Sequence, residues 1–280
     1  MKIAIVTSLN RKLYEYYAHR FYSTYNWPFD CYIYHEGWIP EKHTVIIGNT
    51  SNHIDPIFNN IGIPTIIHRD IHDTNPTLKD FITRNDSKNI FSTIKGTDNS
   101  QIVYGLDFIK DAIRFSYKMF AKTHLMLEGN YDYVFWIDAD VMFKKPITEE
   151  IILRDILPED KTICYLHRPR PPFYPECGFV GYNLTNTHTQ KFVSELRNTY
   201  EKDLLFNEKE WHDSYVWDQV RKRCLSGQPQ QNLTGTRLDG HVWPESKLAP
   251  YTAHLKGKRK KDAGLDERDK QVNKEYYEGR

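Results

Sequence analysis

An apolar run that ends on two aspartates constrains the fold of this chain more than any other feature. The segment "YDYVFWIDADVMFKKPI" spans residues 131–147, and its apolar part, 131–137, is typical of a buried strand. It follows a helical pattern at residues 105–129, with Asp107 near its start and Gly129 just past its end. A helix followed directly by such a strand is typical of α/β proteins with a mostly parallel sheet.

The rest of the sequence repeats this alternation. We expect strands at residues 2–8, 29–37, 161–168, 178–184 and 248–255 and helices at residues 11–26, 189–206 and 214–224. Residues 38–100 contain four prolines and many Asn and Asp residues, and we expect short helices and loops there. The sequence therefore predicts one α/β domain over residues 1–255, with a Rossmann-like, mostly parallel sheet flanked by helices, followed by a charged tail at 256–280.

Composition excludes several classes of protein. Lys plus Arg number 38 and Asp plus Glu 37, which argues against a nucleic-acid-binding protein. The four cysteines form no C-x-x-C motif, so neither a zinc site nor a redox pair is indicated. The N-terminal apolar run is too short for a signal peptide, and no stretch approaches the roughly 20 apolar residues of a transmembrane helix. We therefore expect a cytoplasmic protein.

The two aspartates at the strand end predict a metal site. Asp138 and Asp140 flank Ala139, so their carboxylates lie on the same side of an extended chain. Two close carboxylates repel each other unless a cation lies between them, and hard oxygen ligands favour Mg²⁺ or Mn²⁺. The alternative is a pair of solvated aspartates in a turn.

A late histidine offers a third ligand. The segment "HLKGKRK" places His254, Gly257 and Lys260 in an H-x-x-G-x-x-K pattern. An imidazole binds transition metals, glycine allows close backbone approach, and Lys260, with Lys258, supplies positive charge for phosphates. The alternative for this basic run is a solvated surface.

Taken together, these motifs resemble those of nucleotide-sugar glycosyltransferases with the GT-A fold. The late motif resembles glycosyltransferase family 8, although that family continues with Pro-Trp where this chain has Lys261 and Asp262. The segment "EWHDSYVWDQV" at residues 210–220 is similar to the "WHDES" segment of family 6, with Ser214 in place of the reaction-centre glutamate. The segment "AIRFSYK" at 112–118 is similar to the helix that precedes the D-x-D motif in those enzymes, whose arginine helps to hold the donor.

The resemblance implies a nucleotide-binding half at about 1–147 and an acceptor-binding half at about 148–255. It implies Mn²⁺ or Mg²⁺ as cofactor and a UDP-sugar as donor substrate, with the metal held by Asp138, Asp140 and His254. The residues expected to contact the donor are Thr7, Ser8, Arg114, Lys118, Asp138, Ala139, Gly257, Lys258 and Lys260. Arg114 and Lys118 are one helical turn apart and share a face of their helix.

The loss of the glutamate at Ser214 bears on the mechanism. Without it, inversion is the simpler chemistry, and it needs one carboxylate to deprotonate the acceptor hydroxyl. Asp213 is the first candidate for this base and Asp218 the second. The alternative role for Asp213 is that of an N-cap.

The chain is also similar in length and motifs to the small glycosyltransferases of chloroviruses, which include a xylosyltransferase that builds glycans on a capsid protein. This similarity implies a viral protein in the host cytoplasm, xylose as the donor sugar, and an oligosaccharide or glycoprotein as acceptor. Three alternatives remain open: a retaining hexosyltransferase of the same fold, a metal-dependent sugar nucleotidyltransferase, and a non-catalytic sugar-binding protein. The nucleotidyltransferase is disfavoured because "TSLNRKLY", after the first strand, contains no glycine for a phosphate loop.

Overall fold

The computed structural model describes residues 1–11, 14, 19–38, 46–47, 65–88, 91–95, 102–106, 108–170, 173–236 and 241–254. Within these ranges, none of the helices has the length and apolar character needed to span a bilayer. The predicted tail at 256–280 lies outside the described residues, as do Gly257, Lys258 and Lys260.

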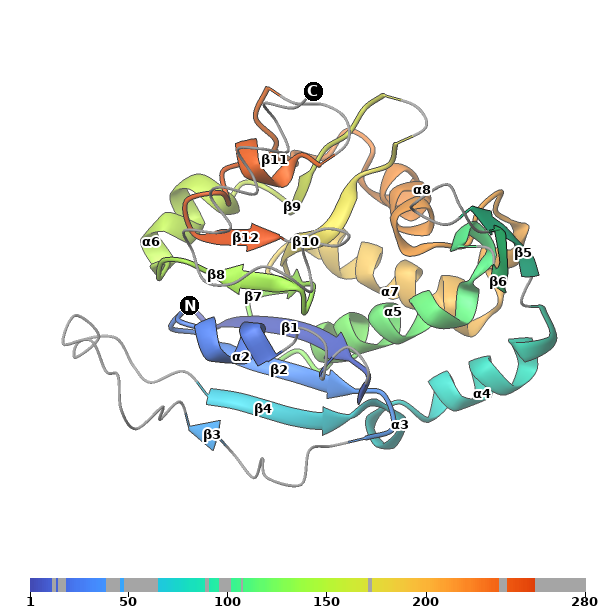
Figure 1. Ribbon diagram of the computed structural model, residues 1–280. Coiled ribbons are helices and arrows are strands. Elements are labelled where there is room, and N and C mark those ends of the chain that lie inside the picture. Colours follow the sequence, from blue (N-terminus) through green and yellow to red (C-terminus); the bar gives the residue numbers. More distant parts are fainter. Residues whose placement is uncertain are drawn as a thin grey trace.

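A central sheet organises the molecule and confirms the predicted α/β class (Figure 1). Its strand order is β11-β9-β10-β7-β1-β2-β4-β3. The central strands β7, β1, β2 and β4 are parallel to one another, whereas β10 is antiparallel to both of its neighbours. The strands of this sheet are β1 (Ile3–Leu9), β2 (Asp30–His35), β3 (Ile46–Ile47), β4 (Thr65–Asp70), β7 (Tyr133–Ile137), β9 (Ile163–Leu166), β10 (Glu176–Asn183) and β11 (Gln231–Asn232).

Two short antiparallel pairs accompany the central sheet. They are β5 (Phe91–Lys95) with β6 (Ile102–Leu106), and β8 (Val141–Phe143) with β12 (Thr252–His254). The second pair matters most for function, because it joins the segment that follows β7 to the last strand of the described chain.

Helices cover both faces of the sheet. The helical elements are α2 (His19–Thr24), α3 (Ile71–Thr74), α4 (Pro76–Asn85), η3 (Asp86–Lys88), η4 (Phe108–Lys110), α5 (Ala112–Leu127), α6 (Glu149–Ile151), η5 (Ile152–Ile156), α7 (Thr187–Glu201), η6 (Leu204–Asn207), α8 (Asp213–Leu225) and η7 (Trp243–Glu245). One core packs α4, α5, α7 and α8 against one face, and a second core packs α2, α6 and η5 against the other. In Figure 1, α5 and α7 run side by side behind the sheet.

Alternation along β1 divides its side chains between these two cores. Val6 packs on the α5 side, whereas Ile5 and Leu9 pack on the α2 side. Since successive side chains of a strand point to opposite faces, Thr7 points to the α2 side and Ser8 to the α5 side. Thr7 and Ser8 therefore present their side chains to opposite faces of the sheet.

Some predicted boundaries need correction. Residues 65–70, expected to be irregular, form strand β4 of the central sheet. The helix expected from residue 105 begins as α5 at Ala112, and its N-cap is Asp111, whose side chain accepts a hydrogen bond from the Arg114 N–H. The predicted helix start, Asp107, lies outside the described residues. Gly129 follows the helix with a positive φ of 72°, as a chain reversal after a helix favours.

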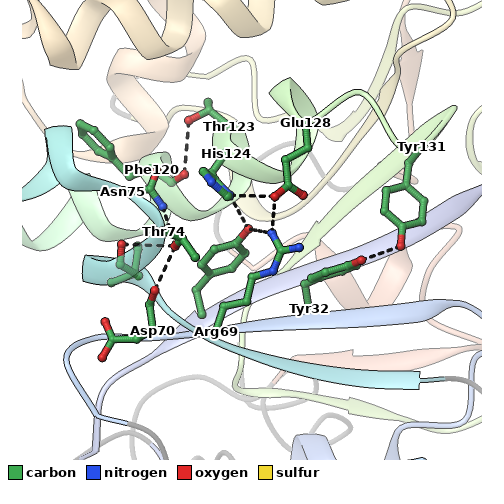
Figure 2. Close-up of polar contacts among 12 residues, drawn as sticks. Tyr32, Arg69, Asp70, Thr74, Asn75, Phe120, Thr123, His124, Glu128 and Tyr131 are labelled. Carbon is green, nitrogen blue, oxygen red and sulfur yellow. Dashed lines mark hydrogen bonds and ion pairs between the residues drawn. The ribbon is translucent and has the colours of Figure 1, made fainter. Parts of the chain in front are cut away.

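A polar cluster fixes the C-terminal end of α5 to the sheet. Figure 2 shows Arg69 of β4 beside Glu128 and His124, and its guanidinium donates to the Glu128 carboxylate at 2.7 Å. The same guanidinium lies 4.6 Å from the centre of the Tyr32 ring, on β2. These contacts orient α5, whose opposite end carries Arg114 and Lys118 to the functional edge of the sheet.

Candidate metal and donor site

The two predicted metal-ligating aspartates lie in a turn at the carboxyl end of β7. The Asp138 N–H donates to the Gly178 carbonyl of β10 at 2.8 Å, and the Val141 N–H donates back to the Asp138 carbonyl at 3.1 Å. These bonds hold the turn between β7 and β8 rigidly. The buried Ala139 in its middle packs into the core on the α2 side.

Pairing of β12 with β8 brings the third predicted ligand to the same place. His254 is the register partner of Val141, directly after Asp140. Its Nε2 lies 3.1 Å from Oδ1 of Asp140, and both side chains are buried. One ligand atom each from Asp138, Asp140 and His254 lie within 4.8 Å of one another. The sequence thus correctly predicted that these three residues come together.

The surroundings of this cluster fit a divalent cation. Gly178 faces it without a side chain, and a Cβ there would lie 3.1 Å from Cε1 of His254 and 3.3 Å from Oδ2 of Asp138. The buried Nδ1 of His254 has no hydrogen-bond partner among the described residues. Two carboxylates and one imidazole are ligands that Mn²⁺ accepts. The residues present therefore fit Mn²⁺ or Mg²⁺.

Lys118 holds the Asp138 side chain in one orientation. Lys118 of α5 donates to Oδ1 of Asp138 at 2.8 Å and to the Cys177 carbonyl at 2.7 Å. The Trp136 indole donates to the same Asp138 oxygen at 2.7 Å. Because Oδ1 receives both bonds, Oδ2 is the oxygen that remains oriented toward Gly178 and the cluster.

Asp213 shares the same lysine. Its Oδ2 lies 2.8 Å from the Lys118 ammonium, and its side chain is only 8% exposed. Burial opposes ionisation of Asp213, but Lys118 and the nearby Lys122 outweigh it and lower the pKa of this carboxyl. Burial likewise opposes the charge on Lys118, yet Asp138 and Asp213 raise its pKa well above the usual value. The pair is a fixed internal salt bridge, and its carboxylate is a weak proton acceptor.

The alternative role of Asp213 as an N-cap is wrong. His212 is the N-cap of α8, and its Nδ1 accepts a 3.4 Å hydrogen bond from the Tyr215 N–H, which leaves Asp213 as the first helical residue. Burial is the main cause of the raised pKa of the Cys177 thiol, to about 12, and the Ser214 side chain acts in the opposite direction.

Asp218, the second predicted base, points elsewhere. Its carboxylate pairs with Arg221 at 2.6 Å and with Lys222 at 2.7 Å, and its side chain is 4% exposed. As expected from their spacing, Asp213 and Asp218 do not face the same neighbours.

A second buried lysine was not anticipated from the sequence. Lys122 follows Lys118 by one turn of α5, is fully buried, and its ammonium has no hydrogen-bond partner among the described residues. Burial lowers the pKa of Lys122 to about 8. The i, i+4 repeat of Arg114, Lys118 and Lys122 is the signal that identifies it.

The predicted donor-binding residues divide between the two faces of the sheet. Thr7 is fully buried on the α2 side, whereas the half-buried Ser8 lies on the α5 side with Lys118. Strand order reverses between β1 and β7, and ligands of open α/β sheets bind in the crevice at such a point. Ser8 and Asp138 lie at this crevice.

Glu36, not singled out from the sequence, lies directly after β2 and beside the end of β1. Its N–H donates to the Leu9 carbonyl at the end of β1, which holds the end of β2 beside it. Burial raises the pKa of Glu36 to about 7, although a hydrogen bond with Asn10 and the charge of Arg114 both act to lower this pKa. A carboxyl group on the strand after β1 is a frequent ribose ligand in dinucleotide-binding sheets.

No family model and no curated protein matches the chain. Among solved structures, mouse xyloside xylosyltransferase 1 is 11% identical, with a TM-score of 0.49 over 94% of this chain and all of that one. The galactosyltransferase LgtC, bound to donor and acceptor sugar analogs, is 12% identical, with a TM-score of 0.45 over 99% of both chains. The glycosyltransferase GlyE of Streptococcus pneumoniae is 13% identical, with a TM-score of 0.42 over 82% of this chain and 45% of that one. Because these scores lie below 0.5, the function proposed below rests on the residues of the site.

Proposed function

We propose that this protein is a metal-dependent glycosyltransferase that moves a sugar from a UDP-sugar to a hydroxyl group of a glycan acceptor. The observation that carries this proposal is the cluster of Asp138, Asp140 and His254 at the carboxyl edge of the sheet, beside the crevice between β1 and β7. A nucleotide in the crevice would place its diphosphate at that cluster. The D-x-D and late H-x-x-G-x-x-K motifs support the same reading.

Each residue of the site has a role in this reaction. When bound, Mn²⁺ or Mg²⁺ would supply a Lewis acid to the leaving diphosphate. Lys118 and Trp136 fix one oxygen of Asp138, so that the other is presented without reorganisation. We assign Ser8, Arg114 and Glu36 to the nucleoside side of the crevice, and Gly257, Lys258 and Lys260 to the phosphates.

We assign Asp213 a positioning role. Its salt bridge keeps Lys118 charged and in place, and the same lysine orients Asp138. This role replaces that of a base, for which a carboxylate with a lowered pKa and a lysine partner is poorly suited.

The finer assignments follow from the sequence resemblance. We propose xylose as the donor sugar, an oligosaccharide on a glycoprotein as the acceptor, and inversion at the anomeric carbon. Inversion is favoured because Ser214 is a poor base and a poor stabiliser of a cationic sugar centre.

The test is UDP release from a panel of donors. The purified protein is incubated with Mn²⁺ and UDP-xylose, UDP-glucose, UDP-galactose or GDP-mannose, and released nucleotide is measured with and without EDTA. We expect metal-dependent UDP release that is lost in Asp140→Asn. Pyrophosphate release from UTP and a sugar phosphate would instead identify a nucleotidyltransferase. Sugar binding without any nucleotide binding would identify a binding protein.

A further inference from the structure

Glu210, Asp213 and Asp218 lie just before or within the first half of α8, and among the described residues only Glu210 has no lysine or arginine partner. Asp213 pairs with Lys118, and Asp218 pairs with Arg221 and Lys222. For Glu210, the imidazole of His212 is the only ion-pair partner among the described residues. Glu210 is thus the carboxylate of this segment that no lysine or arginine of the described residues binds.

Two hydrogen bonds hold the Glu210 side chain in one orientation. The Tyr174 hydroxyl donates to Oε1 at 2.8 Å, and Nε2 of His212 lies 2.9 Å from Oε2. Because Nδ1 of His212 accepts the Tyr215 N–H, we assign the ring proton to Nε2, which makes it the donor to Glu210. Each carboxylate oxygen can accept a second hydrogen bond, so both retain capacity for a further donor.

The surroundings of Glu210 connect it to the donor site from two directions. Tyr174 precedes Cys177 by three residues, and the Cys177 carbonyl accepts a hydrogen bond from Lys118. Glu210 precedes Asp213 by three residues, and Asp213 is bound to the same lysine. Both segments therefore converge on Lys118, which also holds Asp138.

Two tyrosines beside Glu210 offer aromatic rings of the kind that bind sugars. The rings of Tyr174 and Tyr215 meet edge to face with centroids 5.0 Å apart, and both residues, like Glu210, are partly exposed. Tyrosine faces beside a carboxylate suit a sugar ring, which offers C–H faces and hydroxyl donors.

We propose that Glu210 binds the acceptor hydroxyl and takes its proton, with Tyr174 and His212 as positioning residues. This inference rests on the proposed glycosyltransferase function. In the step, the acceptor O–H bond breaks and its proton passes to a Glu210 oxygen. The freed electron pair of the acceptor oxygen forms the new bond to the anomeric carbon. The bond from that carbon to the diphosphate oxygen breaks, and its electrons leave with UDP.

The test compares Glu210→Gln with a matched control, Glu208→Gln. Glu208 lies in the same segment, but its carboxylate pairs with Arg223 at 2.6 Å. Transfer is measured from the best UDP-sugar of the donor panel to a series of methyl glycosides, and Mn²⁺-dependent UDP binding is measured by calorimetry. For Glu210→Gln we expect kcat to fall on the order of 10²- to 10⁴-fold, with acceptor KM and UDP binding within a few-fold of wild type. Glu208→Gln should leave all three unchanged.

A second variant guards against a purely structural effect. Glu210→Asp keeps the charge but withdraws it by one methylene, and we expect a smaller loss of kcat with UDP binding intact. A Glu210→Gln enzyme with kcat within twofold of wild type would overturn the proposal, and so would one in which only the acceptor KM rises. An equal loss of UDP binding in Glu210→Gln and Glu210→Asp would overturn it as well. Wild-type protein that releases no UDP from any donor would instead refute the glycosyltransferase function itself.

Discussion

Replacing Glu36 by glutamine is expected to stabilise the protein above neutral pH. Glu36 lies at the carboxyl end of β2 with a pKa raised from 4.5 to about 7, chiefly because burial penalises its charged form. A carboxyl group whose folded-state pKa is raised stabilises the protein fully below the unfolded-state pKa, and this stability is lost as the pH rises through the folded-state pKa. The relevant window is therefore pH 4.5 to 7.

The size of the effect follows from the shift. The difference between 4.5 and about 7 is roughly 2.5 pKa units, and one unit corresponds to about 1.36 kcal/mol. Above pH 7, the ionised Glu36 therefore lowers the free energy of unfolding by about 3 kcal/mol. At pH 5 the same linkage lowers the free energy of unfolding by only about 1 kcal/mol. Glutamine has no charge to desolvate and retains a partner for Asn10. The free energy of unfolding of Glu36→Gln, relative to wild type, should thus rise by about 2 kcal/mol between pH 5 and pH 8.

Urea denaturation at pH 5, 6.5 and 8 measures this difference. Comparing the variant with wild type at each pH cancels the titration of every other group. Glu150→Gln is the matched control for the loss of one carboxylate, because the Glu150 side chain is 83% exposed. A difference between Glu36→Gln and wild type that stays constant across the three pH values would refute the reasoning.

Three further variants test other parts of the site. Asp140→Asn should abolish the rise in melting temperature caused by Mn²⁺. The metal-free variant should be at least as stable as the wild type, because the substitution removes one of two like charges. A melting temperature that still rises with Mn²⁺ would contradict the metal assignment. Gly178→Ala should weaken Mn²⁺ binding about 10- to 100-fold in a calorimetric titration, because its Cβ would crowd His254 and Asp138. Asp218→Asn should lower the free energy of unfolding in urea by about 3 kcal/mol, because it removes the buried carboxylate partner of Arg221, and it should leave UDP binding unchanged. Weakened UDP binding would instead indicate a role of Asp218 at the donor.

The fold was largely predictable from residue patterns because the central strands are apolar and long enough to be distinctive. β1, β2 and β7 are almost wholly buried, and most of the residues in each are apolar or aromatic. β4 was missed because its six residues include His68, Arg69 and Asp70, which serve a polar cluster rather than the core. β8 was missed because it has three residues and gains its identity only by pairing with β12.

The candidate site was predictable where ligands follow strand ends and unpredictable where side chains meet across elements. Asp138 and Asp140 follow an apolar strand, and His254 ends another, so sequence alone placed them at one edge. The salt bridge between Asp213 and Lys118 joins residues 95 positions apart in the sequence, and no local sequence pattern indicates it. Glu36 and Glu210 were overlooked for the same reason, since their character comes from burial and from neighbours supplied by β1, α5 and the segment before β10.

Lys118 also explains how the carboxylates of this site can divide their roles. It is a single cation shared by Asp138, which follows β7, and Asp213, which begins α8. Asp138 thereby keeps one oxygen for the metal, whereas buried Asp213 is held as a charged anchor with a lowered pKa. Close carboxylates with different environments take different functions. Glu210, three residues before this anchor, pairs with His212 and not with Lys118, and it is the carboxylate to which we assign the proton of the acceptor hydroxyl.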